Sequence, residues 1–354
     1  MILVNNGAAS LSWRVRIIGE DTHGPIDKIA FIEARKGEVL RSWNNVETIE
    51  AFSSDNRGFF NGQVGLTTDK TTNYRLKDPS RGNQLTCDML NRQGSCYYMD
   101  DTDNKWGDGT LSNRQSVAVD AQYGTAITWD YFKNIHGRNG IANDSKGAIN
   151  RVHYGRSYNN AFWSDSCFCM TYGDGDGVTF NPFDSLDVAG HEMSHGVTSR
   201  TAKLTYSGES GGLNEATSDI FGTMVEYYAA NTNDSPDYLI GEKLYKSGTN
   251  ALRAMYQPSL DGKSADCWYS GLGSLDVHYS SGVANHFYYV LAEGTTPSGG
   301  PSSPVCTDTD ISNASGTASI VGIGRSRAEK ISVPRFNCLH DFCNQLCRRQ
   351  SGHT

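Results

Sequence analysis

The chain has 354 residues, a formal net charge of −8 and a hydrophobic fraction of 37%. This length allows two domains with separate cores, and no apolar run approaches the ~18 residues that a membrane span needs. The negative net charge argues against a nucleic-acid surface, since phosphate contacts need clustered Lys and Arg. We therefore predict a soluble globular protein with neither a nucleic-acid nor a membrane partner.

The nine cysteines are an odd number, and their placement favours an oxidising compartment. Cys87 and Cys96 flank a polar turn and predict a local disulfide, whereas spacing does not give the partners of the other cysteines. Because no cysteines show the paired C-x-x-C spacing of a zinc site, disulfides in a secreted, extracellular protein are the preferred interpretation. Residues 1–7 are too short in apolar residues for a signal peptide, which predicts an incomplete chain.

The first part of the chain predicts a small β module. Residues 13–17 alternate apolar and polar side chains and predict a strand, and residues 29–40 predict a hairpin folded at Lys36-Gly37. The polar stretch 44–61 that follows predicts a linker that a protease could cut.

Residues 63–183 are mostly short strands and turns, and residues 117–135 predict one helix among them. Tyr172–Gly177 alternates Gly and Asp, which favours a tight structural turn over a calcium loop, since the twelve-residue ligand pattern is missing. After Pro182 the pattern becomes helical, with predicted helices at 186–196, 212–230 and 283–293. This order predicts an α+β fold with a β-rich domain at 49–185 and a mainly helical domain at 186–331.

The segment Val188–Thr198 contains the pattern H-E-x-x-H. His191 and His195 are four residues apart and lie on one face of a helix, so both imidazoles can reach one metal ion. Glu192 stands close enough to act on a metal-bound water without binding the metal. A catalytic zinc site usually has three protein ligands and keeps a fourth position for water, so the third ligand must come from another element.

The segment Gly212–Asp219 supplies that ligand on a second helix. Glu215 and Asp219 are four residues apart and share one helical face. Assigning Glu215 as the ligand leaves Asp219 or Asn214 to hold the histidine N–H groups, which sets the tautomer of each imidazole. Without this second helix, the acids would read as ordinary solvated charges.

Spacing separates the candidate zinc peptidase classes. Thr201 stands where the metzincin pattern requires a third histidine, so that class is excluded. The interval between His195 and Glu215 has the length found in the thermolysin-like neutral metalloendopeptidases, and the chain resembles that family from about Ser12 to Lys330. The resemblance is carried by H-E-M-S-H together with the segments Tyr158–Trp163, Tyr172–Gly177, Gly212–Asp219, Leu252–Met255 and Asp276–Gly282.

The resemblance implies a zincin fold with the metal helix at the junction of its two domains, and a role for each matching residue. His191, His195 and Glu215 would bind zinc, and Glu192 would take a proton from the zinc-bound water and pass it to the leaving amine. His278 and Tyr206 would donate to the oxyanion, although His278 read alone is an ordinary histidine. The residues implied in peptide binding are Asn160, Ala161 and Arg253, with Phe180, Val188 and Leu252 lining an apolar pocket.

The resemblance also implies structural calcium, which prefers oxygen ligands. The matching carboxylates are Asp187, Glu226, Asp237 and Glu242. Leu239 stands where family members with a paired calcium site carry an acid, so we expect one ion.

The two ends of the chain differ from the family pattern. Residues 1–48 resemble the last part of the family's inhibitory propeptide, and residues 332–354 abandon the pattern, which suggests a frameshift or a misjudged splice and a shortened C-terminus. Helices that normally cover apolar faces would then be missing.

The sequence therefore predicts a secreted, monomeric zinc endopeptidase, made as a zymogen, that cuts on the N-terminal side of bulky apolar residues in proteins and peptides. The alternative is a catalytically inactive, truncated fragment that acts only in binding or inhibition. A structural zinc domain is disfavoured, because no fourth Cys or His ligand is evident.

Overall fold

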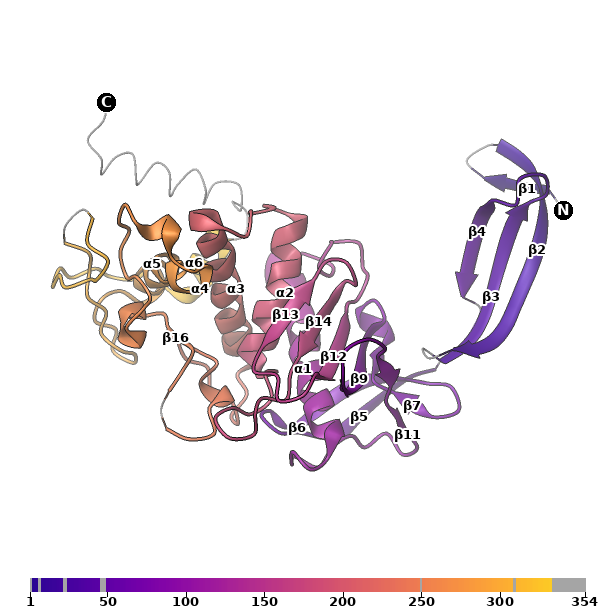
Figure 1. The fold of residues 1–354 in the computed structure, drawn as a ribbon, viewed down its shortest axis with the longest axis horizontal. Coiled ribbons are helices and arrows are strands. Elements are labelled where there is room, and N and C mark those ends of the chain that lie inside the picture. The colour runs from indigo at the N-terminus through magenta and orange to yellow at the C-terminus, as the bar shows by residue number, and fades with distance from the viewer. Residues whose placement is uncertain are drawn as a thin grey trace.

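The computed structural model describes residues 2–5, 8–21, 24–44, 49–248, 250–307 and 310–332. In this part the chain forms a small N-terminal sheet, a β-rich half with one long helix, and a helical half (Figure 1). The predicted α+β class is confirmed. The divergent tail predicted at 332–354 lies outside the described residues, apart from Ser332 at the end of the last helix.

The N-terminal sheet is antiparallel, has its strands in sequence order and stands apart from the rest of the chain in Figure 1. Its strands are β1 (Ile2–Asn5), β2 (Ala8–Asp21), β3 (Gly24–Glu33) and β4 (Val39–Asn44). The predicted hairpin is confirmed, because β3 pairs with β4 across a turn where Gly37 has a φ of 74°. Leu11 and Trp13 on β2 are 56% and 67% exposed, so one apolar face of this sheet is largely open to solvent.

The polar stretch 44–61 is not the linker that its composition predicts. A strand runs through it, and Asn56 in that strand is fully buried, with its amide donating to the carbonyls of Ser53 and Val64. Polar side chains that bond inside a sheet look like loop residues in a sequence, which explains the wrong prediction. Residues 45–48 lie outside the described chain. The four-stranded sheet formed here contains β5 (Ile49–Gly58), β6 (Gly62–Lys70), β7 (Tyr74–Arg75) and β11 (Asp100–Asp101).

A six-stranded sheet carries one edge of the site. The order is β10-β9-β12-β14-β13, with β8 paired to β9, so β13 is an edge strand that pairs antiparallel with β14. An edge strand leaves backbone N–H and C=O groups free to pair with another chain. The strands are β8 (Lys77–Asp78), β9 (Gln84–Arg92), β10 (Tyr97–Tyr98), β12 (Ile149–Tyr154), β13 (Ala161–Ser164) and β14 (Cys169–Tyr172).

The long helix of the β-rich half is α1 (Arg114–His136), which confirms the helix predicted at 117–135. It begins after Asn113, whose side chain accepts the backbone N–H of Gln115. It ends at Gly137, which has the left-handed φ of 65° that favours glycine at a helix C-terminus.

The Gly-Asp turn at 173–177 is held by its own hydrogen bonds, in agreement with a structural turn. Oδ1 of Asp176 accepts the backbone N–H groups of Val178, Thr179 and Phe180 at 2.8, 2.7 and 3.0 Å. These bonds hold the pKa of Asp176 well below its usual range, so its carboxylate is satisfied without a metal.

The helical half packs around α2 and α3, which lie against each other (Figure 1). α2 contributes Val188 and Met193 to one hydrophobic core and Val197 to a second, so it joins the two halves. The close approach needs glycine, because a Cβ on Gly222 would lie 2.4 Å from the Asp187 carbonyl oxygen. The helices are α2 (Leu186–Arg200), α3 (Gly208–Ala229), α4 (Val277–Ser280), α5 (Gly282–Glu293) and α6 (Arg325–Ser332), with a short sheet of β15 (Leu239–Ile240) and β16 (Arg253–Ala254) beside them.

The described cysteines form three disulfides. The predicted Cys87–Cys96 bridge is confirmed, and Cys167–Cys169 and Cys267–Cys306 are also paired. Among the described helices, none is both long enough and apolar enough to cross a membrane.

Candidate active site

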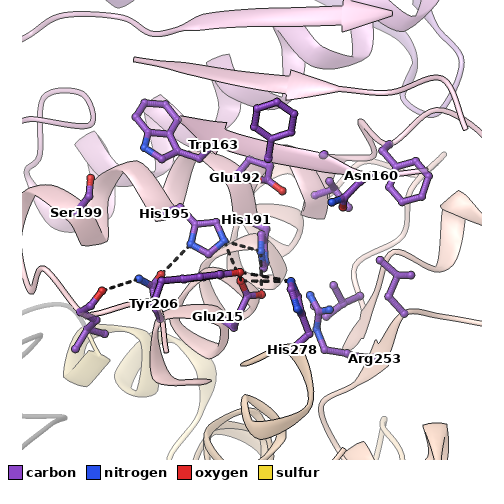
Figure 2. Close-up of a pocket in the computed structure, with 18 of the residues that line it drawn as sticks. Asn160, Trp163, His191, Glu192, His195, Ser199, Tyr206, Glu215, Arg253 and His278 are labelled. Carbon is purple, nitrogen blue, oxygen red and sulfur yellow. Dashed lines mark hydrogen bonds and ion pairs between the residues drawn. The ribbon is translucent and has the colours of Figure 1, made fainter. Parts of the chain in front are cut away.

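The two central helices bring the three predicted zinc ligands together (Figure 2). His191 and His195 come from α2, and Glu215 comes from α3. The Nε2 atoms of the two histidines are 3.0 Å apart, and they lie 3.5 and 3.4 Å from carboxylate oxygens of Glu215. Three donor atoms that converge from two packed helices form a geometry in which one metal ion could be held.

Neighbouring side chains orient both imidazoles. Nδ1 of His191 donates to Oδ1 of Asp219, and Nδ1 of His195 donates to Oδ1 of Asn214, each at 2.8 Å. The amide of Asn214 cannot be the other way round, because its Nδ2 donates to the Leu204 carbonyl. Both residues proposed to hold the histidine N–H groups therefore do so, and both Nε2 atoms face the centre of the site.

The donor set fits zinc better than it fits a purely protein network. With both Nδ1 atoms donating, two neutral imidazoles would point their Nε2 lone pairs at each other. Without an ion, a proton must lie between these two nitrogens. Burial lowers the pKa of His195, but the hydrogen bond and charge of Glu215 outweigh this effect and raise the pKa to about 9. A divalent cation in place of that proton satisfies both nitrogens and the carboxylate.

Glu192 lines the cleft beside the two histidines and is buried. Burial raises its pKa, and the opposing charges of His191 and His195 only partly offset that effect. A raised pKa suits a carboxylate that accepts and returns a proton near neutral pH.

Tyr206 and His278 lie beside the metal ligands (Figure 2), and both side chains are about half exposed. The hydroxyl of Tyr206 donates to Glu215 and lies 3.5 Å from Nε2 of His278, so the two predicted oxyanion donors meet at the ligand carboxylate. Nδ1 of His278 is 2.7 Å from Oδ1 of Asp276, which also accepts the His278 backbone N–H as the cap of α4. No role in holding His278 was predicted for Asp276, although Asp276 is the first residue of the motif that contains His278.

Arg253 lines the cleft, and its guanidinium group is paired with a buried carboxylate. Its Nε and Nη2 atoms each donate to Asp219 at 2.7 Å, and Nδ2 of Asn285 donates to the same carboxylate at 2.8 Å. Although burial raises it, the charges of Arg253 and His191 hold the pKa of Asp219 well below its usual range. The sequence offered no signal for Asn285, which reaches Asp219 from α5.

The metal site opens into a cleft of about 690 Å³. Asn160 and Ala161 line it, as predicted, but Phe180 does not, because its ring packs away from the cleft on Tyr245 and Phe183. Phe183 replaces it in the lining. Phe183, Val188 and Leu252 belong to one hydrophobic cluster and line the cleft together with Ile240; we call these four residues the apolar pocket.

The predicted calcium ligands lie near one another, and one further acid joins them. Glu226 and Glu242 are grouped with Asp234, for which no role was predicted, so that one ion could contact all three. Burial raises the pKa of both Glu226 and Glu242, and the charges of Asp187 and Asp237 raise it further. Asp187 itself accepts from Ser185, Val188 and Gly241. Both carboxylate oxygens of Glu226, both of Asp234 and Oε2 of Glu242 are buried with no hydrogen-bond partner, which fits a hard cation.

Two family models match this chain. One describes the catalytic domain of thermolysin metallopeptidase and matches residues 54–199, and the other describes its alpha-helical domain and matches residues 202–338. Among the described residues, the cleft lining begins at Asn160, well after the N-terminal sheet.

Similar proteins are known from several bacteria. The transglutaminase-activating metalloprotease of Streptomyces mobaraensis is 52% identical over 331 residues, which cover 92% of this chain and 42% of that protein. The bacillolysin of Bacillus caldolyticus and the thermolysin of Bacillus sp. (strain EA1) are each 37% identical over 330 residues, covering 87% of this chain and 55% of their own length. The chain thus spans about half the length of the curated relatives it matches.

Among solved structures, the precursor of protealysin, a metalloproteinase from Serratia proteamaculans, is 33% identical with a TM-score of 0.49, covering 59% of this chain and 67% of that one. The two matching family domains and the identity to the curated metalloproteases agree with the site geometry. The chain belongs to the thermolysin metallopeptidase family.

Proposed function

We propose that this protein is a zinc endopeptidase that cuts peptide bonds on the N-terminal side of bulky apolar residues. One observation carries the proposal: His191, His195 and Glu215 converge with both Nδ1 atoms bound elsewhere, and Glu192 lies buried beside them in an open cleft. A structural zinc site would close all its positions with protein ligands, whereas a cleft over three ligands leaves room for a substrate.

The residues around the site can divide the work of hydrolysis. Zinc bound there supplies polarisation of the scissile carbonyl and a lowered pKa of water at its open position. Glu192 accepts the proton of the attacking water and returns it to the leaving amine nitrogen. Tyr206 and His278 donate hydrogen bonds where negative charge develops on the carbonyl oxygen, and Asp276 holds the His278 ring in place for this.

The cleft suits an extended peptide. β13 is an edge strand of its sheet and lines the cleft, so a substrate can pair with it as one more strand. The apolar pocket of Phe183, Val188, Ile240 and Leu252 lies beside the metal ligands and would take the side chain that follows the cut bond. Arg253 is placed to bind a peptide carbonyl while it remains paired with Asp219.

We further propose where the protein acts and how it matures. Three disulfides suit an oxidising compartment, so we propose that the protein is secreted. We propose that it acts there as a monomer. We also propose that residues 1–48 are the end of an inhibitory propeptide, which is removed when the enzyme matures.

Hydrolysis of a defined peptide tests the main proposal. We expect the purified protein to cut casein and a peptide with a single internal Leu, on the N-terminal side of that Leu, with 1,10-phenanthroline abolishing the activity and added zinc restoring it. Mass spectrometry of the products locates the cut. Stoichiometric zinc binding without turnover would contradict the proposal and favour an inactive binding fragment.

One calcium ion at Glu226, Asp234 and Glu242 is a second proposal, and it predicts how stability depends on pH. Burial and neighbouring acids raise the pKa of Asp234 to about 7 and that of Glu242 to about 9. The calcium-free folded state therefore holds more protons than the unfolded chain from about pH 4 to pH 9, and its free energy of unfolding falls as pH rises. Bound calcium offsets the repulsion between the ionised carboxylates, so the increase in Tm caused by calcium should grow with pH.

Calorimetry from about pH 5 to pH 9, with calcium or EGTA at constant free zinc, measures this effect. Glu226→Gln provides the matched variant, because it removes one buried charge and should raise the calcium-free Tm at alkaline pH while weakening the calcium response. An equal calcium effect at both ends of the pH range would contradict the proposed site.

A further inference from the structure

One end of the cleft carries a positive charge that the proposed reaction does not use. The Lys203 end of the cleft is lined by Trp163, Asp165, Ser199, Lys203 and Leu204. Figure 2 shows Ser199 and Trp163 on the opposite side of the two metal-binding histidines from Asn160 and Arg253. The apolar pocket lies on the Arg253 side, since Ile240 pairs with Arg253 across β15 and β16 and Leu252 precedes Arg253 in the chain. Substrate residues at the Lys203 end would therefore lie on the far side of the cut bond from the apolar pocket.

The other charges at this end cancel each other. Asp165 forms an ion pair with Arg200 and also accepts from Nε1 of Trp163 at 2.8 Å and from Oγ of Ser199 at 2.9 Å. Arg200 lies over the ring of Phe168, 5.0 Å from its centre, so its position is further restrained.

Lys203 is the exposed cation that remains. Within the described ranges, no carboxylate lies within ion-pair distance of its ammonium group. The side chain is exposed and lines the cleft, so a ligand can reach it. The net charge at this end of the cleft is therefore positive.

The backbone at Lys203 is held in a conformation that lysine rarely adopts. Its φ is +52°, and its N–H donates to the Thr198 carbonyl at 2.8 Å just past the end of α2. Glycine is the usual residue at such a left-handed position, because a side chain destabilises it. Other non-glycine residues of this chain, such as Leu90 and Phe168, also have a positive φ, so the conformation marks Lys203 as a strained position and does not by itself assign its side chain a function.

The loop that carries Lys203 is tied to the metal site. The next residue, Leu204, accepts a hydrogen bond through its carbonyl from Asn214, whose Oδ1 accepts from the metal-binding His195. The backbone at Lys203 is thus fixed relative to the metal site. A peptide paired along β13 advances about 3.3 Å per residue, so a side chain within a few residues of the cut bond comes within reach.

We propose that Lys203 makes this end of the cleft selective for peptides that carry an acidic side chain among the three residues before the cut bond. The inference rests on the proposed endopeptidase function and names its substrate class more closely. The ammonium group pairs with the substrate carboxylate, while Asp165, neutralised by Arg200, does not repel it.

Matched peptides test the proposal. Each has one internal Leu after the cut bond and carries either Asp or Asn at one of the three preceding positions. We expect the wild-type protein to show a kcat/KM about fivefold higher for Asp than for Asn at one position, the size of a partly exposed ion pair, with a smaller ratio at high salt. Lys203→Gln should bring that ratio close to one, and Lys203→Glu should invert it.

Two further variants make the result decisive. Lys203→Gly relieves the left-handed backbone, so it should lose the Asp preference while its Tm rises, which separates the charge effect from unfolding. Lys146→Gln removes an exposed lysine outside the cleft and should keep the wild-type ratio. If no peptide is cut by the wild type, the proposed function fails; if peptides are cut with an Asp/Asn ratio near one, or with a ratio that the Lys203 variants leave unchanged, only this inference is overturned.

Discussion

Replacing Glu192 with Gln is expected to lower kcat/KM by about 10³-fold without removing the metal. The substitution keeps the size and burial of the side chain but removes the carboxylate that accepts and returns the proton, a contribution of about 10²–10⁴ for a placed general base. Glu192 is not among the three converging ligand atoms, so zinc content by metal analysis should stay at one ion per chain.

Glu50→Gln is the matched control for this variant, because Glu50 is exposed on β5 and does not line the cleft. It should have wild-type kinetics and wild-type zinc content. Full activity in the Glu192→Gln protein would refute the assigned base, and loss of zinc from that protein would show that Glu192 supports the metal instead.

Replacing Asp219 with Ala is expected to impair both stability and metal affinity. Asp219 accepts from His191, from two nitrogens of Arg253 and from Asn285, and it is fully buried. Its loss leaves a buried guanidinium without a counter-charge, which lowers the free energy of unfolding by about 3–5 kcal/mol. It also frees the His191 ring, which should weaken zinc binding by about 10- to 100-fold.

A double variant separates these two effects. Asp219→Ala combined with Arg253→Met removes the unpaired guanidinium, so denaturant unfolding should regain part of the lost stability. A zinc competition titration should find the metal affinity still reduced, because His191 still lacks its partner. Wild-type stability in the single variant, or wild-type zinc affinity in the double variant, would contradict the roles proposed for Asp219.

The predictions that succeeded rest mostly on local regularity. A helical period places His191 and His195 on one face whatever surrounds them, and alternation with a Gly37 turn specifies the hairpin of β3 and β4. The need for a third ligand from another element pointed to Glu215, with Asp219 or Asn214 to hold the histidine N–H groups, and the resemblance supported that assignment. A helical period cannot by itself pair these residues with α2, but the structure brings them together.

The predictions that failed depend on contacts between distant segments. β5 was read as a linker, because its polar side chains find partners only across the sheet. Phe180 was assigned to the cleft, but Phe183, three residues later, turns toward it. No role was predicted for Asp234, which joins Glu226 and Glu242 because the loop after α3 returns it to that helix.

The sequence by itself determined the types and spacing of the candidate metal ligands, since His191 and His195 share one helix face and Glu215 stands in a second helical segment. Only the tertiary structure decided which groups complete that site: Asp276 behind His278, Asn285 on Asp219, and Lys203 at the end of the cleft. The physical reason is how far apart in the sequence the interacting residues lie. A helix places residues four apart without help, whereas a hydrogen bond or a charge that crosses the cleft exists only once α2, α3, α5 and β13 have packed together.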